Sequence, residues 1–254
     1  MPIIQHETNS DGIATITLAR AETANALSEA MLKGLEAALL KANSDDSARV
    51  IVIAAEGKIF CAGHDLAEMR QHVNRSYFDA LFTCCSKVML SIRHSKKPVI
   101  AKVQGAAVAA GCQLVASCDL AYAADHAKFG VNGINLGLFC STPAVPLSRA
   151  MPPRQALELL LTGDLITANR AAELGLINAA LPADQLDEHV AKIASTIADK
   201  QHDALSMGKH LFWQQLGVSE EAAYGKAASC MATNIGLVET QKRIDGFLTK
   251  RRAH

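Results

Sequence analysis

The sequence has no excess of charge of either sign and no long hydrophobic run. Its 254 residues include 25 Lys and Arg and 25 Asp and Glu, so nothing in the overall charge favours binding to nucleic acid or to an anionic membrane. No apolar run approaches the roughly 18 residues of a membrane span. The first residues, MPIIQHETNSDG, resemble neither a secretory signal nor a transit peptide. We therefore expect a soluble cytoplasmic protein without a membrane span or a nucleic-acid partner.

Cysteine pairs at metal-binding or redox spacing are also missing. The seven cysteines form an odd set without a CxxC pair, and several lie within apolar runs. This pattern favours a reducing compartment and predicts no metal site. Because 50% of the residues are hydrophobic, the chain can bury a large core as one domain, or as a core with a smaller appendage.

Strand-like and helix-like segments alternate in the first half of the chain. Short apolar runs that end near glycine are typical of strands buried on both faces, and such strands separated by helices predict a largely parallel α/β sheet. From about residue 183 the pattern is almost entirely helical, so we expect a core at 1–198 and a helical C-terminal region at 199–254. Asp119, between a helix and a strand, is expected to accept hydrogen bonds from backbone donors. The expected strands are 12–19, 49–57, 97–105 and 118–124. One helix is expected to begin after Ser28, and two others are expected at 77–93 and 110–117.

Two segments, 51–69 and 98–123, each lead from a buried strand through a small-residue turn into a helix. The first N–H groups of a helix have no partner within the helix, and the helix dipole adds positive potential there. Two such turns can direct backbone donors at one oxygen, as the enolate of a thioester requires. The alternative is that glycine and alanine only allow helix and strand to pack closely.

Taken together, these segments resemble the crotonase superfamily, also called the enoyl-CoA hydratase/isomerase family. FCAGHDLAEM and QGAAVAAGCQLVASCDLAYA match its two oxyanion segments, and FGVNGINLGLF, LLTGDLITANRAAELGLIN and FLTKRR match later motifs. The resemblance covers nearly the whole chain and implies a crotonase-like fold, in which repeated ββα units form a superhelical core followed by a helical trimerisation region. It also implies trimers or dimers of trimers, acyl-CoA thioester substrates of fatty acid metabolism, and no cofactor beyond the coenzyme A of the substrate.

The resemblance places the family's oxyanion hole at the backbone N–H groups of His64 and Ala110. At the positions of the two hydratase glutamates this chain has Gln113 and Gly133. An amide can hold a water or a substrate group, and we expect Gln113 to project toward the oxyanion site, but neither residue can act as an acid or base. Ordinary enoyl-CoA hydration is therefore doubtful. The His64 imidazole is a less favoured candidate for the missing base.

The same resemblance implies a set of substrate-binding residues. Cys140 as a nucleophile has no partner histidine in the sequence, so a buried small residue is the favoured interpretation. Lys250 and Arg251 could bind the phosphates of coenzyme A, or they could form a solvated basic tail. The implied substrate-binding residues are Ala62, Asp65, Leu66, Asn132, Cys140, Lys250 and Arg251.

Three functional hypotheses remain open. The first is an acyl-CoA-binding protein, nominally a lyase, that keeps the oxyanion hole and has lost the hydratase acids; decarboxylation or thioester cleavage would be compatible with it. The second is a catalytically silent protein that binds acyl-CoA or serves as a scaffold. The third, a dinucleotide-binding loop at GAAVAAG, lacks the G-x-G-x-x-G spacing and is weak.

Overall fold

A six-stranded sheet forms the base of the core in the computed structural model, which describes residues 2–252 and the side chains of residues 2–249. Its order is β1-β2-β3-β5-β7-β10, and every neighbouring pair is parallel except β1 and β2. The predicted strands at 12–19, 49–57, 97–105 and 118–124 lie in this sheet. Its strands are β1 (Ile4–Thr8), β2 (Ile13–Leu18), β3 (Val50–Ala55), β5 (Val99–Val103), β7 (Leu120–Ala124) and β10 (Ala179–Leu181).

A second sheet of four strands, in the order β4-β6-β8-β9, lies beside the first. Each strand has only three residues, and β8 and β9 form its antiparallel pair. The sequence analysis did not separate these strands. They are β4 (Ile59–Cys61), β6 (Ala106–Val108), β8 (Lys128–Gly130) and β9 (Leu165–Thr167).

The two sheets are linked by repeated strand-strand-helix units. Strand β3 leads into β4 and the helices α2 and α3, β5 leads into β6 and α4, and β7 leads into β8 and α5. This repetition confirms the predicted crotonase-like core of ββα units. The helices of these units are α2 (Leu66–Gln71), α3 (Arg75–His94), α4 (Ala110–Ser117) and α5 (Ser141–Ala150).

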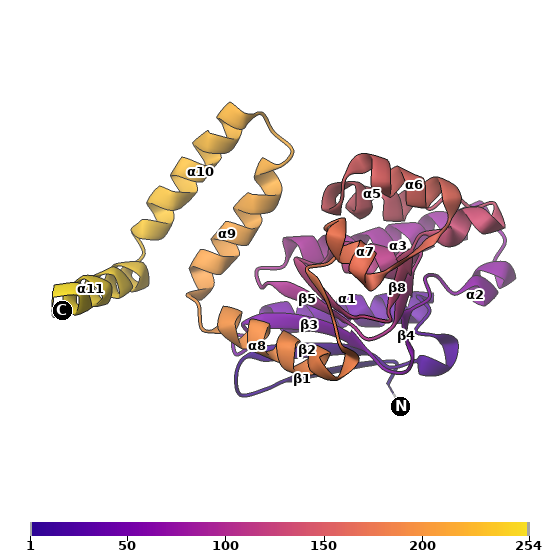
Figure 1. Cartoon of the computed structure of the whole chain (residues 1–254), viewed down its shortest axis with the longest axis horizontal. Coiled ribbons are helices and arrows are strands. Elements are labelled where there is room, and N and C mark those ends of the chain that lie inside the picture. Colours follow the sequence, from indigo (N-terminus) through magenta and orange to yellow (C-terminus); the bar gives the residue numbers. More distant parts are fainter. Residues whose placement is uncertain (1, 253–254) are drawn as a thin grey trace.

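Of the remaining core helices, α1 packs between the six-stranded sheet and α3, α8 packs on the other face of that sheet, and α6 packs on α5 (Figure 1). Helix α1 begins after Ser28, as predicted, and the Ser28 hydroxyl accepts a hydrogen bond from the backbone N–H of Met31. Short 3-10 turns join several elements. The other helices of the core are α1 (Glu29–Ser44), α6 (Pro153–Thr162), α7 (Ala168–Glu173) and α8 (Leu186–Ala198), with turns η1 (Ala21–Thr23), η2 (Asn132–Leu136) and η3 (Ala183–Gln185).

Three helices extend away from the core after α8 (Figure 1). They are α9 (His202–Gln215), α10 (Glu220–Ile235) and α11 (Val238–Arg252), and they confirm the predicted helical C-terminal region. No residue of α9 or α10 is buried as a whole in the single chain, although the Lys209 side chain of α9 is. The proposed boundary between 198 and 199 falls in the turn between α8 and α9, and the division into two domains stays a prediction.

A buried ion pair attaches α9 to the core. The Lys209 ammonium lies 2.6 Å from the Asp119 carboxylate, and their side chains are only 7% and 13% exposed. Asp119 also accepts the N–H of Val99 at 2.7 Å and the indole N–H of Trp213 at 2.9 Å. The guanidinium of Arg93 stacks 3.4 Å from the centre of the Trp213 ring. The structural role predicted for Asp119 is therefore confirmed.

We expect Asp119→Ala to lower the free energy of unfolding by about 3 to 5 kcal/mol, because it leaves the Lys209 ammonium buried without a counter-charge. Urea denaturation at fixed protein concentration measures this change. The control is Lys102→Met, which breaks the exposed Lys102–Asp187 pair and should cost less than about 1 kcal/mol. Equal effects of the two substitutions would contradict the assignment.

Candidate functional site

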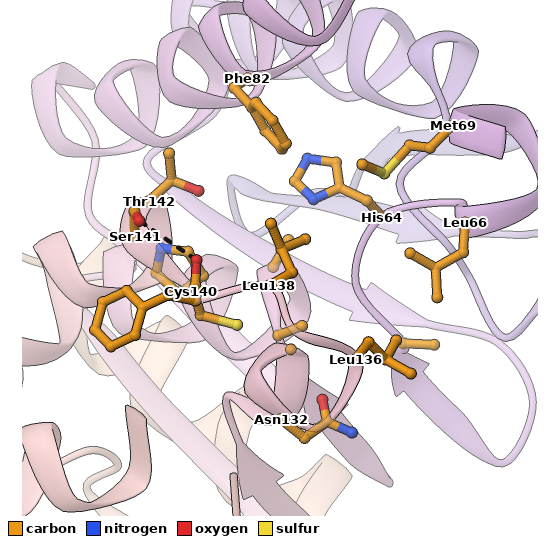
Figure 2. Close-up of a pocket in the computed structure, with 16 residues that line it drawn as sticks. His64, Leu66, Met69, Phe82, Asn132, Leu136, Leu138, Cys140, Ser141 and Thr142 are labelled. Carbon is orange, nitrogen blue, oxygen red and sulfur yellow. Dashed lines mark hydrogen bonds between the residues drawn. The ribbon is translucent and has the colours of Figure 1, made fainter. Parts of the chain in front are cut away.

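A cavity of about 330 Å³ opens where the carboxyl ends of β4 and β6 meet η2 and the start of α5 (Figure 2). Such a position, outside the ends of parallel strands, is a common ligand site in α/β proteins. Most of its wall is apolar. The lining residues are Ala62, His64, Leu66, Met69, Phe82, Ala109, Ala110, Asn132, Gly133, Leu136, Leu138, Phe139, Cys140, Ser141, Thr142 and Pro143.

The two predicted turns pack directly on each other at this cavity. Gly63 has a φ of +93°, and a Cβ atom added to it would lie 2.9 Å from the Ala109 Cβ and 3.2 Å from the Ala110 nitrogen. Only glycine fits such a contact and such a backbone conformation without strain. His64, the residue after Gly63, therefore follows directly on this contact with the N-terminus of α4.

The backbone N–H groups of His64 and Ala110 are free in the described part of the chain. Leu27 donates to the Gly63 carbonyl and accepts a bond from the Asp65 N–H, so this parallel bridge leaves the His64 N–H pointing away from Leu27. The Ala110 N–H is the first of α4, where a helix offers no internal acceptor. No described residue accepts a hydrogen bond from either group.

Ala109 holds the start of α4 in a strained backbone conformation. Its φ of 49° and ψ of −119° lie in a region that alanine rarely adopts. Its N–H donates to the Gly130 carbonyl at 2.8 Å, and its carbonyl accepts the Gln113 N–H at 3.0 Å. These bonds hold a conformation that costs of order 1 to 3 kcal/mol, as is common at functional sites.

The His64 imidazole lies in an apolar part of the cavity wall. Its ring meets Phe82 edge to face, with 5.3 Å between the ring centres and an angle of 89°. The Nε2 atom is buried, and no described residue forms a hydrogen bond with it. Burial lowers the pKa of His64 to about 4, because the charged imidazolium loses its hydration. The ring is thus neutral near pH 7.

Gln113 is buried in α4 and does not line the cavity. Its side-chain oxygen lies 4.0 Å from the Cys85 thiol of α3. We expected the Gln113 side chain to project toward the oxyanion site, but Gln113 is not among the residues that line the cavity. All eight residues of α4 are buried, so packing against α3 accounts for the position of the amide. Its functional role stays a prediction.

Gly133 lines the cavity and leaves no room for a side chain. A Cβ atom there would lie 2.6 Å from the Leu138 carbonyl oxygen and 2.7 Å from the Cys140 sulfur. Asn132 and Cys140 also line the cavity. Burial raises the pKa of the Cys140 thiol, which keeps it protonated near pH 7 and argues against a nucleophile.

The remaining predicted residues are divided between the cavity and its surroundings. Ala62 and Leu66 line it. Asp65 does not; its carboxylate caps α2 by accepting the N–H groups of Ala67 and Glu68 at 3.1 Å. The side chains of Lys250 and Arg251 lie outside the residues whose side chains are described.

The sequence analysis missed most of the apolar wall. Met69 follows Leu66 by three residues on α2, so helical spacing was a usable signal for it. Phe82 comes from the middle of α3, where nothing local marks one apolar residue as cavity-lining. The other missed apolar residues are Leu136, Leu138, Phe139 and Pro143.

Comparison with known proteins shows the family to which the chain belongs. The family model described as Enoyl-CoA hydratase/isomerase matches residues 8–254. The chain belongs to this family. It is 43% identical over 251 residues to the mitochondrial enoyl-CoA hydratase domain-containing protein 3 of Rattus norvegicus, covering 99% of this chain and 84% of the relative. This similarity places the chain in that branch of the family.

The chain is also similar to a more distant relative and to two solved structures. The crotonyl-CoA hydratase of Syntrophomonas wolfei is 30% identical over 246 residues, covering 95% of this chain and 94% of the relative. An enoyl-CoA hydratase of Mycobacterium smegmatis superposes with a TM-score of 0.96 at 45% identity, covering 98% and 97% of the two chains. The human domain-containing protein 3 superposes with a TM-score of 0.95 at 43% identity, covering 98% of each chain.

One expectation from the sequence is wrong. The relatives from rat, mouse and human are named as mitochondrial proteins, which contradicts the expected cytoplasmic location. That expectation rested partly on balanced charge and unpaired cysteines, and neither property distinguishes one reducing compartment from another. All seven cysteines are free in the structure. Within residues 2–252, no helix is long and apolar enough to span a membrane, and no group of side chains is suited to holding a metal ion.

The buried imidazole predicts a specific pH dependence of stability. The unfolded His64 binds a proton near pH 6.5, whereas the folded one does so only near pH 4, so this contribution to stability is complete above pH 6.5 and is lost as the pH falls toward 4. Between pH 7 and pH 5 the unmodified protein should lose about 2 kcal/mol more unfolding free energy than His64→Phe. Urea denaturation at both pH values tests this, and identical losses would contradict a neutral buried ring.

Proposed function

We propose that the cavity binds the acyl group of an acyl-CoA thioester and that the N–H groups of His64 and Ala110 hold the thioester oxygen. Three features of the structure support this proposal. Both N–H groups lack hydrogen-bond partners among the described residues, Gly63 brings the first turn against the Ala110 nitrogen, and the strained Ala109 fixes the start of α4. Two preorganised donors of this kind stabilise an enolate oxygen by a few kcal/mol each in the transition state.

We also propose that this protein catalyses the hydration of enoyl-CoA weakly or not at all. At the glutamate positions implied by the family resemblance, Gln113 carries an amide that faces Cys85 and Gly133 carries no side chain. Each positioned acid or base contributes about 10²- to 10⁴-fold to a rate. An enolate can therefore be stabilised here without the proton transfers that hydration requires.

A silent acyl-CoA-binding protein is the second candidate. It is favoured by the absence of any Asp or Glu side chain among the described residues that line the cavity. Decarboxylation and thioester cleavage are the alternatives that retain chemistry, since both can use an oxyanion hole. Product analysis by mass spectrometry after incubation with a malonyl-type and a saturated acyl-CoA distinguishes these reactions from binding alone.

We expect crotonyl-CoA hydration by the unmodified protein to be at least about a hundredfold slower than by the crotonyl-CoA hydratase of Syntrophomonas wolfei, because both carboxylates are missing. Gln113→Glu should gain less than about tenfold, since Gly133 still supplies no partner. The loss of absorbance of the enoyl thioester measures turnover. Gln113→Met is the matched control for volume, and turnover within tenfold of the hydratase by the unmodified protein would refute the proposal.

We also propose that α9, α10 and α11 assemble the chain into a trimer or a pair of trimers. Large hydrophobic side chains are exposed along these helices, and an apolar surface of this extent usually marks an interface. Those more than 45% exposed are Phe212, Leu216, Tyr224, Met231, Ile235, Val238, Phe247 and Leu248.

Light scattering at micromolar concentration should give three or six times the 27.0 kDa of one chain. Met231→Glu should lower that mass, because it places a charge on the proposed interface. The matched control Leu40→Glu alters an exposed leucine of α1 and should leave the mass unchanged. A monomer of unmodified protein would overturn the proposed assembly.

A further inference from the structure

The cavity wall carries almost no charge or ionisable chemistry. Among the described lining residues there is no Asp, Glu, Lys or Arg, and His64 is the one histidine. The other polar side chains are short: Asn132, Ser141 and Thr142. Ser141 donates its hydroxyl hydrogen to the Phe139 carbonyl at 3.3 Å, so this group has a partner within its own loop. Among the described lining residues, His64 is the one with a buried side-chain polar atom, Nε2, that lacks a hydrogen-bond partner.

The position of the imidazole leaves its hydrogen-bonding capacity to a ligand. Figure 2 shows the ring directed into the space between Phe82, Met69 and Leu138, and these neighbours offer no hydrogen bond. The neutral ring has one donor and one acceptor nitrogen. A buried polar atom without a partner is costly. Of the seven such side-chain atoms in the described chain, only the His64 Nε2 belongs to a residue that lines the cavity.

Covalent geometry restricts where such a ligand atom would lie. His64 contributes both the proposed oxyanion donor, through its backbone N–H, and the imidazole, through its side chain, and only a few bonds separate the two. A substrate whose thioester oxygen is held by the backbone therefore presents its α- and β-carbons, rather than the far end of its acyl chain, to the ring.

We propose that the His64 imidazole hydrogen-bonds an uncharged oxygen substituent on the α- or β-carbon of the bound acyl group. The substrate class is thus an acyl-CoA thioester with a hydroxyl or keto group near the thioester and an apolar remainder. This inference rests on the proposed binding of acyl-CoA in the cavity. It gives His64 two roles: its side chain binds the substituent, and its backbone N–H binds the thioester oxygen.

The apolar wall excludes a second class of acyl group. A carboxylate at the end of the acyl chain would lie among Leu66, Phe82 and Leu136 with no cation among the described lining residues. Burying an unpaired carboxylate is strongly unfavourable. Thioesters of dicarboxylic acids should therefore bind more weakly than those of uncharged acids of the same length.

Isothermal titration calorimetry with four probes tests the inference: butyryl-CoA, 2-hydroxybutyryl-CoA, 3-hydroxybutyryl-CoA and succinyl-CoA. We expect at least one hydroxyacyl thioester to bind about tenfold more tightly than butyryl-CoA, as one added hydrogen bond allows. Succinyl-CoA should bind more weakly than butyryl-CoA. His64→Phe, which keeps the backbone N–H and the apolar contact with Phe82, should abolish the hydroxyacyl preference, so that the hydroxyacyl thioesters bind no more tightly than butyryl-CoA to the same variant.

Two further variants complete the design. His64→Gln keeps a hydrogen-bonding side chain and should retain part of the preference. His126→Phe makes the same exchange at an exposed histidine outside the cavity and should change nothing. A preference that survives in His64→Phe, or binding of butyryl-CoA without any preference, overturns the inference alone. Failure of all four probes to bind overturns the proposed function and the inference with it.

Discussion

The close contact between the turn at Gly63 and the start of α4 is the constraint on which the site depends. Besides the contact at Gly63, a Cβ atom added to Gly111 would lie 2.2 Å from the Cys61 carbonyl oxygen. No side chain fits between β4 and α4 at either point. The pairing of β4 with β6 sets this distance, because Cys61 lies opposite Ala107 in the second sheet. Packing of backbone on backbone thus brings the turn that precedes His64 against the start of α4.

The strain at Ala109 is maintained by the same second sheet. Its N–H is bound to the carbonyl of Gly130, at the end of β8, and a Cβ atom on Gly130 would lie 2.6 Å from the Asp164 carbonyl oxygen. Gly130 of β8 therefore packs closely between the start of β9 and the residue that precedes α4. The strands of this second sheet have only three residues each, yet they bury Phe60 and Phe129 completely. They also fix the backbone of Ala109, which leads into the Ala110 N–H.

The sequence predicted those features that depend on local patterns. The buried strands and the bounds of α4 at 110–117 follow from apolar runs and small residues, and Ser28 marks the start of α1. The strands β4, β6 and β8 were missed because three residues carry too little periodicity. The position of Gln113 depends on packing against Cys85, and the contact of His64 with Phe82 joins residues from two elements, so neither leaves a local trace.

Backbone donors and side-chain acids or bases depend on the structure in different ways. A donor N–H survives almost any substitution, provided that Gly63 and Gly111 keep the two turns in contact, whereas an acid or base depends on one side chain in one orientation. At Gly133 no side chain fits, since the Leu138 carbonyl and the Cys140 sulfur occupy the space that a Cβ atom would need. A glutamate at this position would require η2 and the segment before α5 to move.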